Sequence, residues 1–307
     1  MKKLLAIVLT AAMLLAMLCA CAAKPTETAA TDTKATIGIL MPTKEQTIWS
    51  IQGERLTEAF QKAGYATQIE YAEDDSAKQA MQIENMITKG VNVLVIAAVD
   101  CAALTDACEK AKDAGIYVIA DDRLITNTKA VDFYVTFDLV RMGELQGQYI
   151  VDKLDLENQA GPFTLEIFSG SQDDTNATFF YEGAMNKLQP YIDNVVKSGQ
   201  TSYTQTAIQS WDSSKAQSRM DNLLSGYYAD SHLDAVLVAA DCLALGVISS
   251  LESMGYGTDA NPYPIVTGQD AELAAVKNIL AGKQSMTAFL DANALCEIIV
   301  PIVNDVF

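Results

Sequence analysis

Apolar positions along the chain form two alternating patterns: short continuous runs and longer stretches with helical spacing. Residues 36–41 and 91–99 are short apolar runs, and the second has the unbroken hydrophobicity of a strand buried on both faces of a parallel sheet. Residues 49–63 place Ile51, Leu56 and Phe60 at helical spacing and end before Gly64. Strands and helices that alternate with short connections predict a doubly wound α/β sheet.

The alternation occurs twice, which predicts two similar lobes in the 307 residues. The first set contains predicted strands at 36–41, 66–71, 91–99, 116–120 and 132–137, and predicted helices at 49–63, 76–89 and 102–114. The second set contains predicted strands at 163–168, 195–197, 235–239, 264–267 and 285–290, and predicted helices at 141–154, 176–191, 213–229, 244–254, 271–281 and from 293 onward. We assign residues 36–138 with 271–287 to an N-terminal lobe, and 139–270 with 288–307 to a C-terminal lobe.

The first twenty residues have the pattern of an export signal. A basic start, Met1-Lys2-Lys3, precedes an apolar run from 4 to 18 without charge. The following Leu18-Cys19-Ala20-Cys21 resembles the lipobox of bacterial lipoproteins, which implies cleavage before Cys21 and lipidation of its thiol. An ordinary secretory signal remains the alternative. Residues 21–35 are rich in Ala, Thr and Lys and predict a flexible tether. We therefore expect an extracytoplasmic protein held at the cell membrane by its lipid alone.

Charge and reactive side chains exclude several classes of function. The 39 acidic residues outnumber the 21 basic ones, and a net charge of −18 disfavours nucleic acid as a partner. The one histidine, His232, lies in a polar turn, and neither zinc-ligand nor EF-hand spacing occurs. We expect no cofactor, no metal and no catalytic residues. Four cysteines are interpreted as free, buried apolar side chains rather than disulfides: Cys101, Cys108, Cys242 and Cys296.

Polar and aromatic residues follow the predicted strands in both sets. Open α/β sheets bind ligands beyond the carboxyl ends of their strands, so these residues are the candidate binding site. They are Lys44, Trp49, Asp122, Arg123, Asn176, Trp211, Asp241 and Asp270. Carboxylates, amides and a guanidinium pair with sugar hydroxyls, and aromatic rings cover the C–H faces of a sugar. A phosphate ligand is disfavoured, whereas an amino acid stays open. For each residue taken singly, a surface ion pair or core packing is the competing interpretation.

Six segments carry a resemblance to a known family. They are IENMITKGVNVLVIAA (83–98), DDRLITNT (121–128), FYVTFD (133–138), GELQGQYIVDKL (143–154), FSGSQDDTNATFFYEGAM (168–185) and VTGQDAEL (266–273). Between about residues 36 and 307 the chain resembles the xylose-binding and multiple-sugar-binding proteins of ABC importers, which have the type 1 periplasmic-binding-protein fold. The resemblance implies a monomer whose two lobes, joined by three hinge strands, capture a monosaccharide such as xylose, glucose or galactose. It also implies delivery to a membrane permease with a separate ATPase, and the same eight binding residues.

Some positions depart from the family pattern. Ile48 and Leu290 stand where the family has Arg and Lys, Asp121 replaces a Tyr, and Ala240 replaces a polar or aromatic residue. These changes imply a more acidic cleft, suited to a cationic or amino sugar, or a weakened site. Hinges are expected near Asp138, at 268–270 and at 288–291. The chain also stops within a helix where family members continue through a last strand, which suggests a truncated product.

Two other functions remain in view. The same cleft could serve a sensor that presents sugar to a chemoreceptor or a sensor kinase, and neighbouring genes would separate the two. An exported hydrolase is disfavoured, because Asp121 and Asp122 are adjacent in an extended segment and their side chains should diverge. We therefore predict a binding protein and not an enzyme.

Overall fold

A computed structural model describes residues 34–159, 161–192 and 196–307. The predicted signal, Cys21 and the predicted tether up to residue 33 lie outside the described residues. Ala35, which we placed in the tether, is instead buried against the first sheet. None of the helices in the described ranges has the length and apolar content needed to cross a membrane.

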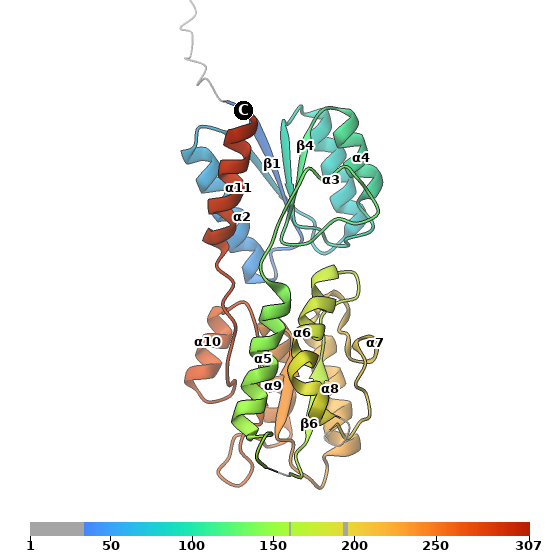
Figure 1. The fold of residues 1–307 in the computed structure, drawn as a ribbon, viewed down its shortest axis with the longest axis vertical. Coiled ribbons are helices and arrows are strands. Elements are labelled where there is room, and N and C mark those ends of the chain that lie inside the picture. The colour runs from blue at the N-terminus through green and yellow to red at the C-terminus, as the bar shows by residue number, and fades with distance from the viewer. Residues whose placement is uncertain (1–33, 160, 193–195) are drawn as a thin grey trace, which may run out of the picture. The chain divides into compact units, whose positions relative to one another are not determined.

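The N-terminal lobe is built on a five-stranded parallel sheet in the order β2-β1-β3-β4-β5. Its strands are β1 (Thr36–Met41), β2 (Ala66–Tyr71), β3 (Val93–Ile96), β4 (Tyr117–Asp121) and β5 (Phe133–Val135). Its helices are α2 (Thr47–Lys62), α3 (Ser76–Thr88), α4 (Thr105–Asp113) and α11 (Ala292–Val306). Helices α3 and α4 lie on one face of the sheet, and α2 and α11 lie side by side on the other (Figure 1).

Both faces of this sheet are apolar because successive residues of a strand point to opposite sides. Val93 and Val95 pack with the cluster that holds α2 and α11, whereas Leu94 and Ile96 pack with the cluster that holds α3 and α4. In the strand order β2-β1-β3-β4-β5, the chain runs outward in one direction from β1 to β2 and in the other direction from β3 to β5, so the switch point lies between β1 and β3. A ligand crevice is expected at the carboxyl ends of these strands.

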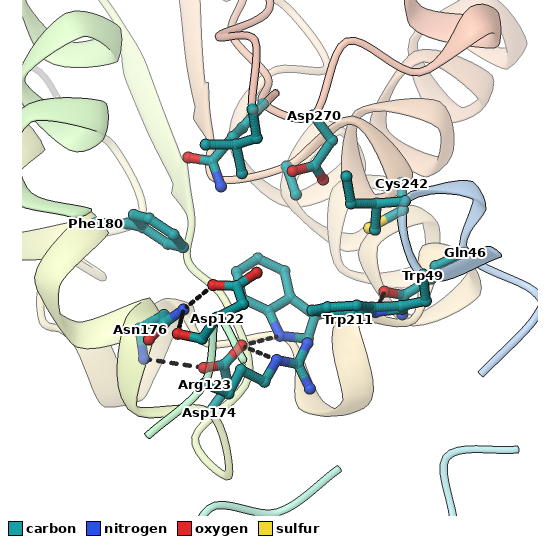
Figure 2. Close-up of a pocket in the computed structure, with 14 residues that line it drawn as sticks. Gln46, Trp49, Asp122, Arg123, Asp174, Asn176, Phe180, Trp211, Cys242 and Asp270 are labelled. Carbon is teal, nitrogen blue, oxygen red and sulfur yellow. Dashed lines mark hydrogen bonds and ion pairs between the residues drawn. The ribbon is translucent and has the colours of Figure 1, made fainter. Parts of the chain in front are cut away.

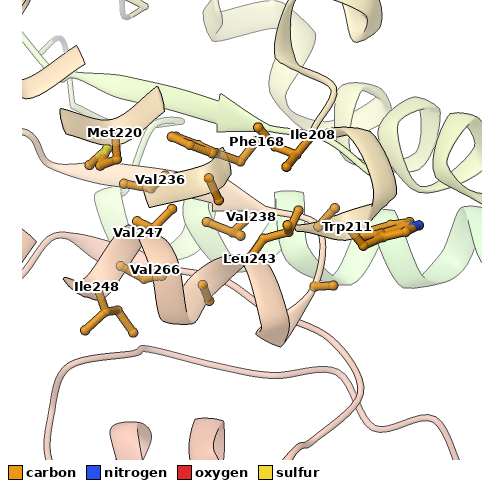
Figure 3. Close-up of a cluster of buried hydrophobic side chains, with 14 of the residues drawn as sticks. Phe168, Ile208, Trp211, Met220, Val236, Val238, Leu243, Val247, Ile248 and Val266 are labelled. Atoms are coloured by element: carbon orange, nitrogen blue, oxygen red, sulfur yellow. The ribbon is translucent and has the colours of Figure 1, made fainter. Parts of the chain in front are cut away.

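The C-terminal lobe holds a three-stranded parallel sheet in the order β6-β7-β8. Its strands are β6 (Leu165–Phe168), β7 (Ala235–Val238) and β8 (Ile265–Val266). Its helices are α5 (Leu139–Leu154), α6 (Thr175–Ile192), α7 (Tyr203–Thr206), the 3₁₀ turn η1 (Gln209–Trp211), α8 (Ser213–Tyr227), α9 (Asp241–Ser253) and α10 (Leu273–Leu280). One face packs on α5 and α6. The other packs on α8 and α9, where Phe168, Val236 and Val238 meet Met220 and Val247 (Figure 3).

Two predicted strands of this lobe do not form. Residues 285–290 make backbone hydrogen bonds with 266–270 and a single parallel bridge between Gln269 and Ala288, without becoming a strand. Residues 196 and 197 lie in a loop, and residue 195 is outside the described range. A short segment can therefore lie beside a sheet, with backbone hydrogen bonds to it, without extending its ladder.

The last two segments of the chain belong to the opposite lobes from those we predicted. Helix α10, which we assigned to the N-terminal lobe, contacts α9 of the C-terminal lobe. Ala288 and Leu290, which follow it, join the core of the C-terminal lobe, to which we assigned them. Helix α11 contacts α2, and its stripe of Leu295, Ile299 and Val303 completes the core of the N-terminal lobe. An i, i+4, i+8 stripe requires an apolar surface to cover it, but the pattern does not specify which sheet supplies that surface.

The described chain passes between the lobes at two places. One is between β5 and α5, near Asp138, and the other lies just before α11, within the predicted hinge at 288–291. The predicted hinge at 268–270 is wrong. This segment stays in the C-terminal lobe, where Asp270 N donates to Ala288 O at 2.8 Å and Ala288 N donates to Gly268 O at 3.0 Å.

Candidate functional site

A pocket is lined by residues of both lobes at the carboxyl ends of their strands, and its empty space, including the part open to solvent, is about 400 Å³. Six of the eight residues singled out in the sequence line it: Trp49, Asp122, Arg123, Asn176, Trp211 and Asp270. Figure 2 shows their side chains gathered around one space.

The N-terminal lobe supplies a stacked aromatic and cationic pair. Trp49 lies in the first turn of α2, is 4% exposed, and donates from Nε1 to Gln46 Oε1 at 3.1 Å. The Arg123 guanidinium carbon lies 4.8 Å from the centre of the Trp49 ring. Asp122 directly follows β4 and has a φ of 63°, a left-handed conformation that is rare outside glycine. Strained backbone of this kind concentrates at functional sites.

A polar network connects the two lobes at the floor of the pocket. Asn176 Nδ2 donates to Asp122 Oδ1 at 2.7 Å and to the Asp122 carbonyl at 3.1 Å. Arg123 Nε lies 2.9 Å from Asp174 Oδ2, and these side chains are 7% and 3% exposed. Asp174 also accepts from Trp211 Nε1 at 3.2 Å. These contacts hold Arg123 and Asn176 in fixed positions (Figure 2).

Asp174 is a central residue that the sequence reasoning missed. It belongs to the polar run after β6, two residues before Asn176, but nothing in that run distinguishes it from Asp173. Its orientation is set locally, because Asp174 Oδ1 accepts from the Asn176 backbone N–H at 2.9 Å at the start of α6. Gln46, Phe180, Cys242 and Gln269 also line the pocket.

The ring of Trp211 lines one side of the pocket, and Gly170 leaves the space that the ring occupies. Its φ is 53°, and its ring meets Phe180 edge-on, with centroids 6.5 Å apart and an interplanar angle of 69°. A Cβ added at Gly170 would collide with the Trp211 ring. The glycine therefore lets the indole lie directly against the loop after β6.

The carboxyl groups of the pocket are electrostatically unusual. Burial, with Asp174 nearby, raises the pKa of Asp122 to about 6, although Arg123 and Asn176 oppose the shift. Burial raises the pKa of Asp270 well above its ordinary value, and Asp241 and Glu272 add to the effect. Asp270 has a φ of 98° and is partly exposed. Burial therefore disfavours the charged form of both carboxyl groups.

Two predicted site residues lie elsewhere. The Lys44 ammonium sits 4.7 Å from the centre of the Tyr71 ring and does not line the pocket. Asp241 is fully buried and accepts from Gln284 Nε2 at 2.8 Å, Thr287 Oγ1 at 2.8 Å and the Glu272 backbone N–H at 3.0 Å. It ties the start of α9 to the segment after α10.

Of the four positions that depart from the family pattern, three line the pocket and one lies elsewhere. Ile48, Ala240 and Leu290 line the pocket, so apolar groups occupy three of its positions. Asp121 does not line it. Both of its oxygens lie 3.2 Å from Gln52 Nε2 inside the N-terminal lobe, so the expectation that it acidifies the cleft is wrong.

The cysteines and possible metal ligands offer no further chemistry in the described residues. Cys101, Cys108, Cys242 and Cys296 are free, as predicted. Cys242 is only partly buried, contrary to expectation, since it lines the pocket. Within the described ranges, no group of three or more His, Cys, Asp or Glu side chains is arranged to hold a metal ion.

Comparisons with known proteins give consistent results. Residues 37–306 match the model of the periplasmic binding protein domain family. The multiple sugar-binding periplasmic receptor ChvE of Rhizobium radiobacter is 52% identical over 88% of this chain and 77% of its own length. The D-xylose-binding periplasmic protein of Escherichia coli is 33% identical over 83% and 74%.

Solved structures show the same similarity. An ABC transporter solute-binding protein from Clostridium phytofermentans, with bound β-D-glucose, superposes with a TM-score of 0.85 at 44% identity, covering 89% of this chain and 84% of that one. A carbohydrate transporter solute-binding protein from Chloroflexus aurantiacus, in complex with D-glucose, gives a TM-score of 0.75 at 33% identity, with 86% and 82% covered.

Proposed function

Because this chain belongs to the periplasmic binding protein family, we propose that it captures a monosaccharide between its lobes and delivers it, chemically unaltered, to an ABC importer. Aldoses such as glucose, xylose and galactose are the ligand class. The names of its relatives support this class, since they describe multiple sugar-binding, xylose-binding and glucose-bound proteins.

The observation that carries the proposal is the composition of the pocket. Trp49 and Trp211, one from each lobe, present ring surfaces suited to the C–H face of a sugar. The same pocket is lined by the carboxyl groups of Asp122 and Asp270 and by the amide of Asn176, which can form hydrogen bonds with hydroxyl groups. No nucleophile–base pair is needed for this task, which fits a binding protein rather than an enzyme.

The lining residues belong to different lobes, and this explains how a sugar would be captured. Asp122 and Trp49 move with the N-terminal lobe, whereas Asn176, Trp211 and Asp270 move with the C-terminal lobe. A ligand that contacts both sets favours the closed arrangement, because only that arrangement makes all the contacts together. Direct contacts between Asp122 and Asn176 and between Arg123 and Asp174 stabilise closure from the same side of the pocket.

Titration calorimetry with D-glucose, D-xylose and D-galactose tests the proposal. At least one sugar should bind, and Asp122→Ala should weaken that binding by at least about 100-fold, since it removes a charged acceptor. Lys44→Ala is the matched control and should bind like the wild type, because its ammonium lies on Tyr71. Absence of binding by all three sugars, or unchanged binding in Asp122→Ala, would contradict the assignment.

We also propose that the protein acts outside the cytoplasm, anchored through a lipid on Cys21. The apolar run from 4 to 18 and the sequence Leu18-Cys19-Ala20-Cys21 support this, and two or three acyl chains are sufficient for stable anchoring. Cys21→Ser should move the protein from the membrane fraction to the soluble fraction of cells. Retention of the variant in the membrane fraction would rule out this anchor.

A further inference from the structure

A second set of contacts between the lobes lies outside the lining of the pocket. Cys101 follows β3 in the N-terminal lobe and is 2% exposed. Its backbone N–H donates to the Asp173 carbonyl of the C-terminal lobe at 3.0 Å, and its Sγ lies 3.5 Å from Thr175 Oγ1. The C-terminal-lobe residues of these contacts and of those at the pocket floor are consecutive in the chain. We call them the clasp: Asp173, Asp174, Thr175 and Asn176.

Each member of the charged pair across the lobes, Asp174 and Arg123, is held in place by its own lobe. Within the C-terminal lobe, Asp174 accepts from Trp211 Nε1 at 3.2 Å and from the Asn176 backbone N–H at 2.9 Å. Within the N-terminal lobe, Arg123 Nη1 donates to the Ala98 carbonyl at 3.0 Å. The pair (Figure 2) therefore forms with little further loss of side-chain entropy when the lobes close.

The pair is buried where the lobes meet, because the Arg123 and Asp174 side chains are 7% and 3% exposed. A buried ion pair favours the structure that contains it only when its geometry is good and additional hydrogen bonds are present. Here Nε and Oδ2 are 2.9 Å apart, and hydrogen bonds within each lobe replace part of the water that both side chains lose. The clasp contacts join atoms of the chain to one another, so they favour closure whether or not a ligand is bound.

We propose that the clasp holds the two lobes together in a large fraction of the sugar-free molecules, so that the pocket opens only when these contacts break. The proposal goes beyond sugar capture, and it rests on the proposed function only in its consequence for the ligand. A sugar that meets an already closed arrangement uses less of its binding free energy to close the lobes, which raises its affinity. Its uptake and release must wait for the clasp to separate, which slows both steps.

Cys101 provides a direct probe of closure. Thr175→Cys replaces an oxygen 3.5 Å from Cys101 Sγ with a second thiol, within reach of a disulfide while the lobes are together. Treated with diamide, the folded sugar-free variant should lose two hydrogens, as measured by mass spectrometry. The rate should be within about threefold of the rate with saturating D-glucose, D-xylose or D-galactose, because the closed arrangement is already populated. The double variant with Cys101→Ser and Thr175→Cys is the control and should not form this disulfide.

Two adjacent substitutions, each added to Thr175→Cys, test the charged pair. Asp174→Asn keeps an amide oxygen for Trp211 but leaves Arg123 without its counter-charge on closure, so the sugar-free rate should fall at least about fivefold. Asp173→Asn is the matched control and should keep the parent rate. Its carboxylate accepts from Gln209 Nε2 at 2.6 Å within its own lobe, and its contact with the other lobe is made by the backbone.

Small-angle X-ray scattering measures the same equilibrium without a cross-link. The radius of gyration of the sugar-free protein should match that of the sugar-bound protein in the wild type, and it should be larger in Asp174→Asn. Circular dichroism should show that both proteins are folded. Adding sugar to Asp174→Asn should reduce its radius of gyration, because contacts with the ligand replace part of the clasp in closing the lobes.

The outcomes separate this inference from the proposed function. If the disulfide forms only with sugar, or forms under neither condition, the clasp does not hold the lobes together and the inference is overturned, whereas calorimetry can still show sugar binding. If Asp174→Asn cross-links as fast as its parent, or has the same radius of gyration as the wild type, the role of the charged pair is overturned. If the sugar-free protein closes as expected but binds no sugar in calorimetry, the clasp stands and the proposed function fails.

Discussion

Replacing Asp121 with Asn should remove a large part of the pH dependence of stability. Asp121 ends β4, is 0% exposed, and has Gln52 Nε2 at 3.2 Å from both carboxylate oxygens. One amide donor cannot offset the loss of water around a buried charge. Burial, with the neighbouring Asp122, raises the pKa of Asp121 from 3.8 to about 7.

The magnitude and sign follow from linkage. The pKa of Asp121 is about three above its ordinary value, and each pKa unit is worth about 1.4 kcal/mol. The protonation of Asp121 can therefore change the free energy of unfolding by about 4 kcal/mol. The raised pKa means that the folded protein keeps the Asp121 proton between about pH 4 and pH 7, whereas the unfolded chain releases it. The stabilising contribution is therefore complete below pH 4 and is lost as the pH rises through 7.

Urea denaturation followed by circular dichroism at several pH values measures this effect. Relative to wild type, Asp121→Asn should become more stable by about 4 kcal/mol on going from pH 4 to pH 8. The exposed control Asp259→Asn should show no such trend. A difference between Asp121→Asn and wild type that stays constant over this range would refute the argument that burial controls this carboxyl.

Three further substitutions test the positioning of the site. Gly170→Ala directs a methyl group into the Trp211 ring, so unfolding free energy should fall by about 1–3 kcal/mol and calorimetry should detect weaker sugar binding. Asp174→Ala leaves the buried Arg123 charge unpaired and should cost about 3–5 kcal/mol in urea denaturation; a loss under about 1 kcal/mol would contradict this. Asp241→Ala leaves three donors without their acceptor and should lower the free energy of unfolding by at least about 1–3 kcal/mol, whereas an unchanged denaturation midpoint would exclude its structural role.

The sequence identified most of the site because strand ends are local features. Asp122 and Arg123 directly follow a buried apolar run, and Asn176 and Asp270 follow two others, so their common location at sheet edges could be predicted. Asp241 follows β7 in the same way, yet its side chain turns inward to Gln284 and Thr287. Position after a strand does not determine the direction of a side chain.

What the sequence alone determined is the alternation of strands and helices, because hydrophobic periodicity fixes which face of each element must be buried. Tertiary structure decided which surface covers that face. Helix α11 packs on α2 rather than in the C-terminal lobe, and Asp174 meets Arg123 across 51 positions of the chain. The Arg123–Asp174 pair follows from the closing of the two lobes around one pocket, whereas the α11–α2 contact follows from the return of the chain to the N-terminal lobe. A residue's own neighbours in sequence carry no information about either surface.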